Sequence, residues 1–166
     1  GLAARGVLFE KAVTQTPLTL PSHASMFTGT NPNVNHVRDT GGFPLPSSDI
    51  TLAKILEQQG WSTAAFVSAF VFEKEFGFNQ GFSVYDDQMP PSENGQTSAV
   101  RSAGATVDHA LDWLNGQSGK PYFVWLHFYD AHQPFALPPA KFQKQYPGDI
   151  YDAEIAYIDQ QLGRFL

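Results

Sequence analysis

The apolar run at residues 122–129 places the strongest constraint on how this sequence can fold. Almost every side chain in it is large and apolar, so neither face of the strand that it predicts is suited to water. A second, smaller apolar run at residues 62–69 has the same character. Strands buried on both faces are typical of parallel sheets covered by helices. The two runs therefore predict an α/β fold.

Helical patterns lie between and beside these runs. The clearest covers residues 98–114, and others cover residues 22–28, about 50–59 with Ser48 or Asp49 as N-cap, and 151–166. Residues 7–13 are a further strand candidate. The order strand, helix, helix, strand, helix, strand, helix predicts a three-layer α/β/α sandwich with a mostly parallel sheet.

Both ends of the sequence read as helical. Residues 1–6 resemble the last turn of a helix that stops at Gly6, and the pattern at 151–166 continues to Leu166 without a stop signal. We therefore expect residues 1–166 to be an internal part of a single domain.

The overall charge excludes some classes of partner. The sequence has 10 Lys and Arg against 16 Asp and Glu, a formal net charge of −6. Broad nucleic-acid or anionic-membrane binding needs clustered basic residues, which are missing here. With Cys 0, disulfides, Cys-based zinc sites and a cysteine nucleophile are excluded. No apolar run approaches the length of a membrane span.

Polar residues follow each predicted strand. In an open α/β sheet, ligands bind outside the carboxyl ends of the strands. The segments at those ends are residues 14–22, Ser68, and residues 130–132. These are the places to look for chemistry.

Thr19 lies just before a helix, on a turn made rigid by Pro21. The amino end of a helix attracts anions, so a hydroxyl there is suited to attack a sulfate or phosphate ester if its pKa is lowered. The alternative is that Thr19 and Ser22 only cap the helix. Spacing alone favours the capping role.

His127, Asp130 and His132 form a second candidate group. A histidine at the end of a strand can bind an anionic substrate or protonate a leaving group. For His127 we favour a hydrogen-bonded core residue, and for Asp130 a turn former. For His132, in a loop beside Pro134, the sequence leaves both roles open.

Three further groups carry weaker signals. His109 is expected on the exposed side of its helix, and the loop residues His36, Arg38 and Asp39 either order their loop or face the site. The pair at residues 86–87 is expected to be solvated rather than to hold a cation.

Taken together, these segments resemble the sulfatase branch of the alkaline phosphatase superfamily, along essentially the whole sequence. The matching motifs are Phe9-Glu10-Lys11-Ala12, residues 17–29, His36-Val37-Arg38-Asp39, residues 51–56, Gly60-Trp61-Ser62-Thr63-Ala64, Gln80-Gly81-Phe82, residues 127–135 and residues 151–159.

The resemblance implies a metal-dependent hydrolase of sulfate or phosphate esters with Thr19 in the position of the nucleophile. It makes Thr19, His23 and His132 catalytic candidates and Ser22 and His132 substrate-binding candidates. Sulfatases oxidise a Cys or Ser here to formylglycine, but the same oxidation of a Thr gives a ketone, so no formylglycine is expected. His23 replaces the Arg of the sulfatase motif. With this change the motif of this sequence is more similar to that of the nucleotide phosphodiesterases, which use an unmodified Thr.

Two other departures concern substrate and metal. Where sulfatases often carry a Lys-x-His pair, this sequence has Ser68-Ala69-Phe70. The family's metal-binding acids match no residue here, so Thr19 is the one metal ligand implied, for Ca, Zn or Mn. We therefore expect residues 1–166 on their own to be inactive or nearly so.

The alternatives are a phosphodiesterase, a phosphonate hydrolase or a phosphoglycan transferase of the same superfamily, or a degenerate member that binds a glycan or a partner protein without turnover. The expected substrate is a small-molecule or glycan ester. Bacterial relatives are often exported, and the sequence leaves both the localisation and the oligomeric state open.

Overall fold

The computed structural model describes residues 2–91, 99–134 and 138–166. At its centre is a parallel sheet of β1 (Ser62–Phe66), β2 (Val84–Asp86) and β3 (Tyr122–Leu126), in the order β2-β1-β3. Ala64 of β1 pairs with Val84 on one side and with Val124 on the other. The predicted parallel α/β arrangement is confirmed.

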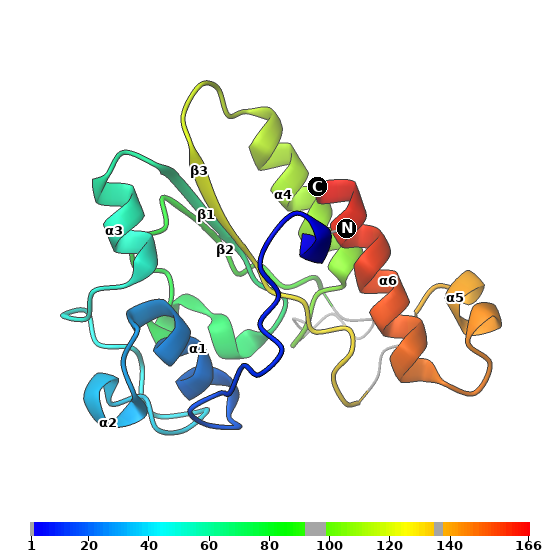
Figure 1. Ribbon diagram of the computed structural model, residues 1–166, viewed down its shortest axis with the longest axis horizontal. Coiled ribbons are helices and arrows are strands. Elements are labelled where there is room, and N and C mark those ends of the chain that lie inside the picture. Colours follow the sequence, from blue (N-terminus) through cyan, green and yellow to red (C-terminus); the bar gives the residue numbers. More distant parts are fainter. Residues whose placement is uncertain (1, 92–98, 135–137) are drawn as a thin grey trace.

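The helices form two layers around this sheet (Figure 1). One side carries α1 (Thr19–Thr28), α2 (Pro32–Asn35) and α3 (Leu52–Gln58). The other carries α4 (Ala103–Asn115) and α6 (Ile150–Phe165), with α5 (Ala140–Gln145) beyond them. Short 3-10 turns occupy Leu2–Ala4, Phe70–Phe72 and Lys74–Phe76. Among the described helices, none combines the length and apolar character that a bilayer crossing needs.

Alternation along the strands divides the core into two. Ala64 and Phe66 of β1 face α4, where they pack against Ala110 and Trp113. Their neighbours face α1, where the core contains Leu20 and Ala24 of α1, Val37, Leu45, Val67, Ala69, Val71, Phe72 and Phe78. This second core is rich in aromatic rings and supports the residues described below.

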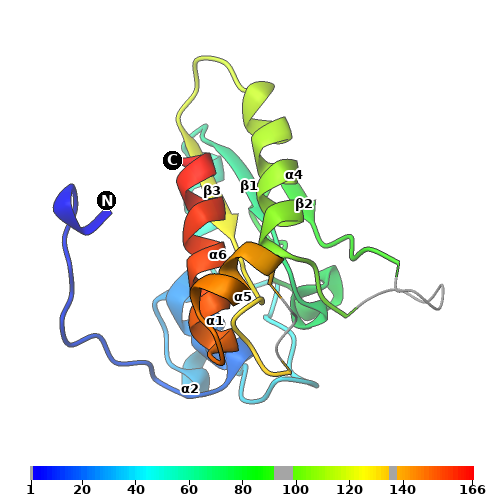
Figure 2. The ribbon, with the colours of Figure 1, turned by 90° about the vertical axis from the view of Figure 1, so that its right-hand side faces the viewer.

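The strand predicted at residues 7–13 does not form. This segment extends away from the rest of the molecule (Figure 2), and Val7, Phe9 and Val13 are 80%, 76% and 84% exposed. It pairs with no strand within the described residues. Apolar character alone is not enough for a strand, because a strand also needs a neighbour to hydrogen-bond.

Other predicted boundaries change for local reasons. The helix predicted at 98–114 begins at Ala103, because Ser102 caps it by accepting the backbone N–H of Ala105. Thr51, not Ser48 or Asp49, caps α3, through the N–H of Lys54. The helix predicted at 22–28 begins earlier, at Thr19, and ends as expected at Gly29 (φ 68°).

The strand β3 is less buried than its sequence suggests. Tyr122 is 45% exposed and the other residues of β3 are half-buried, because β3 lies at the edge of the described sheet. The sequence predicts an irregular segment where the short strand β2 forms. It also predicts a solvated loop at residues 89–95, which lies partly outside the described residues.

Candidate active site

Thr19 is the first residue of α1, and its hydroxyl accepts and donates no hydrogen bond within the described part of the chain. Leu18 occupies the N-cap position and provides no side-chain cap. The Ser22 hydroxyl donates instead to the Thr19 carbonyl, at 2.9 Å. Neither hydroxyl therefore caps the helix, and that of Thr19 is left for another partner.

His23 lies one turn further along α1, with its ring against Phe72 (4.7 Å between centroids) and Trp125 (5.9 Å). Its Nδ1 donates to the Thr19 carbonyl at 2.8 Å, since a carbonyl only accepts. Burial lowers the pKa of His23, and the hydrogen bond to Thr19 offsets only part of this effect. The ring is therefore neutral near pH 7, with its lone pair on Nε2.

His127 follows β3 and lies 5.7 Å from the ring of His23. Its Nδ1 is buried and has no hydrogen-bond partner in the described part of the chain. Burial lowers the pKa of His127 to about 3, with smaller contributions from the charges of His23 and His132. The expected core position is correct, but the expected hydrogen bond to the ring is missing at Nδ1.

His132 lies in the exposed loop after β3 and stacks on Tyr129, with 4.4 Å between ring centroids. Its Nδ1 donates to the backbone carbonyl of Gln133 at 2.6 Å. These two contacts fix the plane of the ring and leave Nε2 as the nitrogen available to a ligand.

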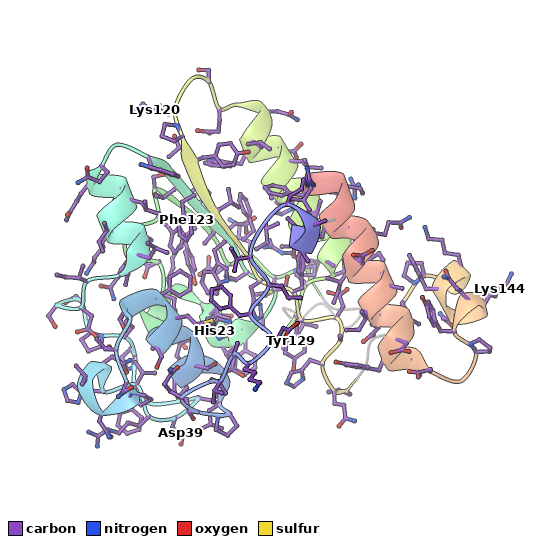
Figure 3. All side chains as sticks on the ribbon, in the orientation of Figure 1. His23, Asp39, Lys120, Phe123, Tyr129 and Lys144 are labelled. Atoms are coloured by element: carbon purple, nitrogen blue, oxygen red, sulfur yellow. The ribbon has the colours of Figure 1, made fainter. Side chains whose placement is uncertain are left out.

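These side chains face one cavity of about 490 Å³ at the carboxyl end of β3. Figure 3 shows His23 and Tyr129 close to each other there, with Lys120 at the opposite end of the strand. The lining residues are Thr19, His23, Thr40, Phe70, Val71, His127, Phe128, Tyr129, Ala131, His132 and Ile158. Three predicted site residues, Thr19, His23 and His132, are thus brought together. Ser22 is not among the lining residues.

Phe70 and His127 are cavity residues whose position the sequence did not reveal. Phe70 stands in the segment where sulfatases often carry a Lys-x-His pair, and it is 48% exposed. Ser68, from the same segment, is fully buried and hydrogen-bonds Thr106 at 2.6 Å. This wall of the cavity is therefore apolar.

The Asp130 carboxylate contacts α4 and does not line the cavity. Both of its carboxylate oxygens accept the backbone N–H of Ala103, at 3.0 and 2.9 Å, so it binds the amino end of α4 rather than forming only a turn. Burial raises the pKa of Asp130, against the backbone hydrogen bonds that it accepts. Its contact anchors the loop that carries His132.

Glu154 of α6 is an acid that the sequence analysis did not single out. It is 1% exposed, and neither carboxylate oxygen has a hydrogen-bond partner among the described residues. Burial and, secondarily, the charge of Asp130 raise the pKa of Glu154 to about 7. The amino end of α4 provides no donor for it, because Asp130, Tyr157 and Ser102 already accept the N–H groups there.

The acids at residues 86–87 are paired with cations instead of being solvated. Asp86 accepts Arg101 at 2.9 Å and also binds His109, while Asp87 lies 3.4 Å from Lys74. Burial alone raises the pKa of Asp86, but the hydrogen bonds of His109 and Gln88 and the charge of Arg101 hold that pKa below its usual value. His109 is exposed as predicted.

The described residues do not form a metal site by themselves. They contain no group of three or more His, Asp or Glu side chains arranged to hold a metal ion. The described lining of the cavity offers hydroxyls and imidazoles but no carboxylate, which hard cations such as Ca²⁺ need. This lining therefore holds such a cation only together with further ligands.

Comparison with known proteins identifies the family. The family model "Sulfatase" matches residues 1–166. The sequence is 24% identical over 135 residues to the Δ4,5-hexuronate-2-O-sulfatase of Bacteroides thetaiotaomicron, a match that covers 79% of this chain and 28% of that protein. The chain thus spans less than a third of that relative.

Two solved structures share the fold. The lipoteichoic acid synthase LtaP from Listeria monocytogenes is 20% identical with a TM-score of 0.64, over 90% of this chain and 39% of that one. BT4656, solved with its substrate D-glucosamine-2-N,6-O-disulfate, is 19% identical with a TM-score of 0.66, over 83% of this chain and 30% of that one.

Proposed function

Since this chain belongs to the Sulfatase family, we propose that it carries the nucleophile and part of the substrate site of a hydrolase acting on sulfate or phosphate esters. One observation supports this proposal above the others. The Thr19 hydroxyl, without a partner in the described residues, faces the same cavity as His23, His127 and His132. A hydroxyl close to imidazoles that can accept or relay its proton is suited to nucleophilic attack.

Four residues have roles in the proposal, and three of them, Thr19, His23 and His132, line the cavity. The Thr19 oxygen attacks sulfur or phosphorus in line, the bond from that atom to the ester oxygen breaks, and the displaced alcohol leaves with the Thr19 proton. Water then hydrolyses the new bond to Thr19, which releases the sulfate or phosphate and restores the hydroxyl. His132, held against Tyr129, orients the transferred group through Nε2. His23 fixes the first turn of α1 through the Thr19 carbonyl and tunes the site, and Ser22 supports the same carbonyl.

A divalent metal belongs to the proposal as a cofactor. Superfamily members are generally metal-dependent, and a bound cation would lower the pKa of the attacking hydroxyl and would neutralise charge on the ester. We propose that Thr19 binds Ca, Zn or Mn together with carboxylates from outside residues 1–166, which form part of the same domain. No formylglycine is proposed at Thr19.

The proposed substrates are sulfated or phosphorylated glycans and small esters. Two of the similar proteins act on sulfated sugars by their names, the hexuronate sulfatase and BT4656. The second candidate function is phosphate-ester chemistry, as a phosphodiesterase, phosphonate hydrolase or phosphoglycan transferase. An unmodified Thr at position 19 and the apolar Phe70 wall favour it, and the synthase LtaP shares the fold.

The test compares Thr19→Ala with Thr19→Ser in the natural protein that contains residues 1–166, with Mn, Zn or Ca added. Substrates are 4-nitrophenyl sulfate, bis(4-nitrophenyl) phosphate and a sulfated disaccharide. We expect Thr19→Ala to lower kcat by about a thousandfold or more with little change in KM, whereas Thr19→Ser keeps the hydroxyl and measurable turnover.

Two outcomes would contradict the proposal. Equal turnover by the wild type and Thr19→Ala would remove Thr19 from the chemistry. Binding of the sulfated disaccharide without any turnover in the wild type would support the degenerate, glycan-binding alternative. We expect residues 1–166 alone to be inactive. This expectation is wrong if they show turnover that metal stimulates and that Thr19→Ala abolishes.

A further inference from the structure

A second, polar hollow lies next to the cavity of Thr19. Its volume is about 530 Å³, and its lining residues are Gln15, Thr16, Asn31, Pro32, Asn33 and Arg38. Amides, a hydroxyl and a guanidinium line it, and no acidic side chain does. The proposed chemistry at Thr19 makes no use of this hollow.

Arg38 is the cation of the hollow, and the structure leaves its charge free. None of the ion pairs or side-chain hydrogen bonds of the described residues involves it. The neighbouring Asp39 forms no ion pair with it among the described residues, and one oxygen of that carboxylate accepts the backbone N–H of Thr40, at 2.6 Å. By contrast, Lys54 and Arg101 are bound by carbonyl or carboxylate groups.

The amides around Arg38 are also free. Asn31 occupies the N-cap position of α2, where an Asn side chain ordinarily accepts a backbone N–H, yet it makes no such bond. No side-chain hydrogen bond of Gln15 or Asn33 occurs within the described residues. The hollow therefore presents unused donors around one positive charge, which suits an oxyanion or a sugar hydroxyl.

Two short chain segments join the hollow to the cavity. Thr16 lines the hollow and Thr19 the cavity, so their Cα atoms are at most about 11 Å apart. Likewise, Arg38 lines the hollow and Thr40 lines the cavity, and their Cα atoms are at most about 7 Å apart. Lining residues of the two sites therefore lie within about 11 Å of each other, so one extended ligand is able to contact both.

We propose that Arg38, with the amides of Asn31 and Asn33, binds a second anionic group of the ester substrate, so that the preferred substrate carries at least two acidic groups. This inference rests on the proposed function, since Thr19 defines where the first group binds. A guanidinium binds sulfate, phosphate or carboxylate with two hydrogen bonds. With a net charge of −6, the chain needs such a local cation to hold a polyanion.

The experiment measures binding and turnover separately in the natural protein that contains residues 1–166. The probes are a disaccharide with one sulfate on each ring and its counterpart with a single sulfate. The variants are Arg38→Gln, Arg38→Lys and, as a matched control, Lys120→Gln. Lys120 is exposed and lies at the opposite end of β3 (Figure 3).

For Arg38→Gln we expect calorimetry to show a tenfold to hundredfold weaker Kd, roughly, for the disulfated probe, and a change within about twofold for the monosulfated one. Arg38→Lys keeps the charge and should lie between, and Lys120→Gln should match the wild type. The loss should shrink in about 0.5 M salt, because exposed charges are screened.

The proposal is overturned if Arg38→Gln weakens both probes equally or neither. This outcome is distinguishable from failure of the proposed function. Thr19→Ala tests the turnover, and the Kd values for the two probes can still be measured in that variant. If Thr19→Ala retains full turnover while Arg38→Gln still discriminates the two probes, the subsite stands and the nucleophile assignment fails.

Discussion

Two groups of charged side chains lie at the carboxyl edge of the sheet, and they differ in whether their acids are paired with cations. In the first, at the end of β2, Asp86 is paired with Arg101 and His109. Arg101 is 3% exposed and also donates to the Val67 carbonyl at 2.9 Å and the Thr106 hydroxyl at 3.2 Å. Each buried charge of this group therefore has a partner.

The second group consists of Asp130, after β3, and Glu154, and neither acid forms an ion pair among the described residues. Asp130 receives the amino end of α4, while Glu154 has no donor at all among the described residues. The pKa values move accordingly: that of Asp86 is lowered, and those of Asp130 and Glu154 are raised.

This difference in pKa gives the two groups different roles: the Asp86 group supports the fold, and the group of Asp130 and Glu154 changes its charge with pH. The Asp86 group holds β1, β2 and α4 together at any pH where Asp86 is ionised. The Asp130 and Glu154 pair takes up a proton near neutral pH, next to the loop that carries His132. A buried pair of like acids costs stability when both are charged.

The largest effect is expected from Arg101→Met, which removes the cation from the paired group. It leaves the Asp86 carboxylate and the Val67 carbonyl without their main partner in a buried place. We expect the free energy of unfolding at pH 7, measured by urea denaturation, to fall by about 3–5 kcal/mol.

The matched control for this prediction is Arg164→Met. Arg164 bonds Asp108 at 2.6 Å, but the two side chains are 45% and 58% exposed. Such a surface pair contributes about 1 kcal/mol or less. If Arg101→Met costs no more than Arg164→Met, the Asp86 group is not the support that its burial indicates.

An intermediate effect of opposite sign is expected from Glu154→Gln. The folded pKa of Glu154, about 7, lies above the ordinary glutamate pKa of 4.5, so the folded state binds more protons between these values. Stability therefore falls as pH rises from about 4.5 to 7, and the penalty is complete above pH 7. Removing the charge should stabilise the fold at pH 8 by about 2 kcal/mol, and by much less at pH 5.

Urea denaturation at pH 5 and pH 8 checks this prediction. Glu57→Gln, at an exposed position of α3, is the control and should keep the pH dependence of the wild type. A Glu154→Gln protein that is less stable than the wild type at pH 8 would show that the carboxylate has a stabilising partner after all.

The elements that the sequence predicted well are those fixed by local pattern. The apolar runs of β1 and β3 and the helical spacing of α4 and α6 need no knowledge of distant residues. The short strand β2 exists because it pairs with β1, a contact that no local pattern reveals. The same lack of a partner explains why residues 7–13 remain exposed although their composition favours a strand.

The candidate site divides along the same line. Thr19, His23 and His132 could be selected because they follow predicted strands or begin a predicted helix, and they do line one cavity. Their catalytic roles stay predictions. Glu154 could not be found in the sequence, since its significance comes from its burial and from the charge of Asp130, which lies on a different segment. The partner of His109 was missed for the same reason, because His109 lies on α4 and Asp86 lies on β2.

The smallest effect is expected from His109→Gln, which sharpens the comparison within the paired group. His109 is 46% exposed, so its bond to Asp86 is partly screened and its loss should cost about 1 kcal/mol or less at pH 7. Because the folded pKa of Asp86 is lowered, its contribution is present above the usual carboxyl pKa and lost as pH falls. The difference between wild type and His109→Gln should therefore disappear in acid. In an Asp86→Asn background it should be absent at pH 7 as well, and an unchanged cost there would mean that His109 acts through another contact.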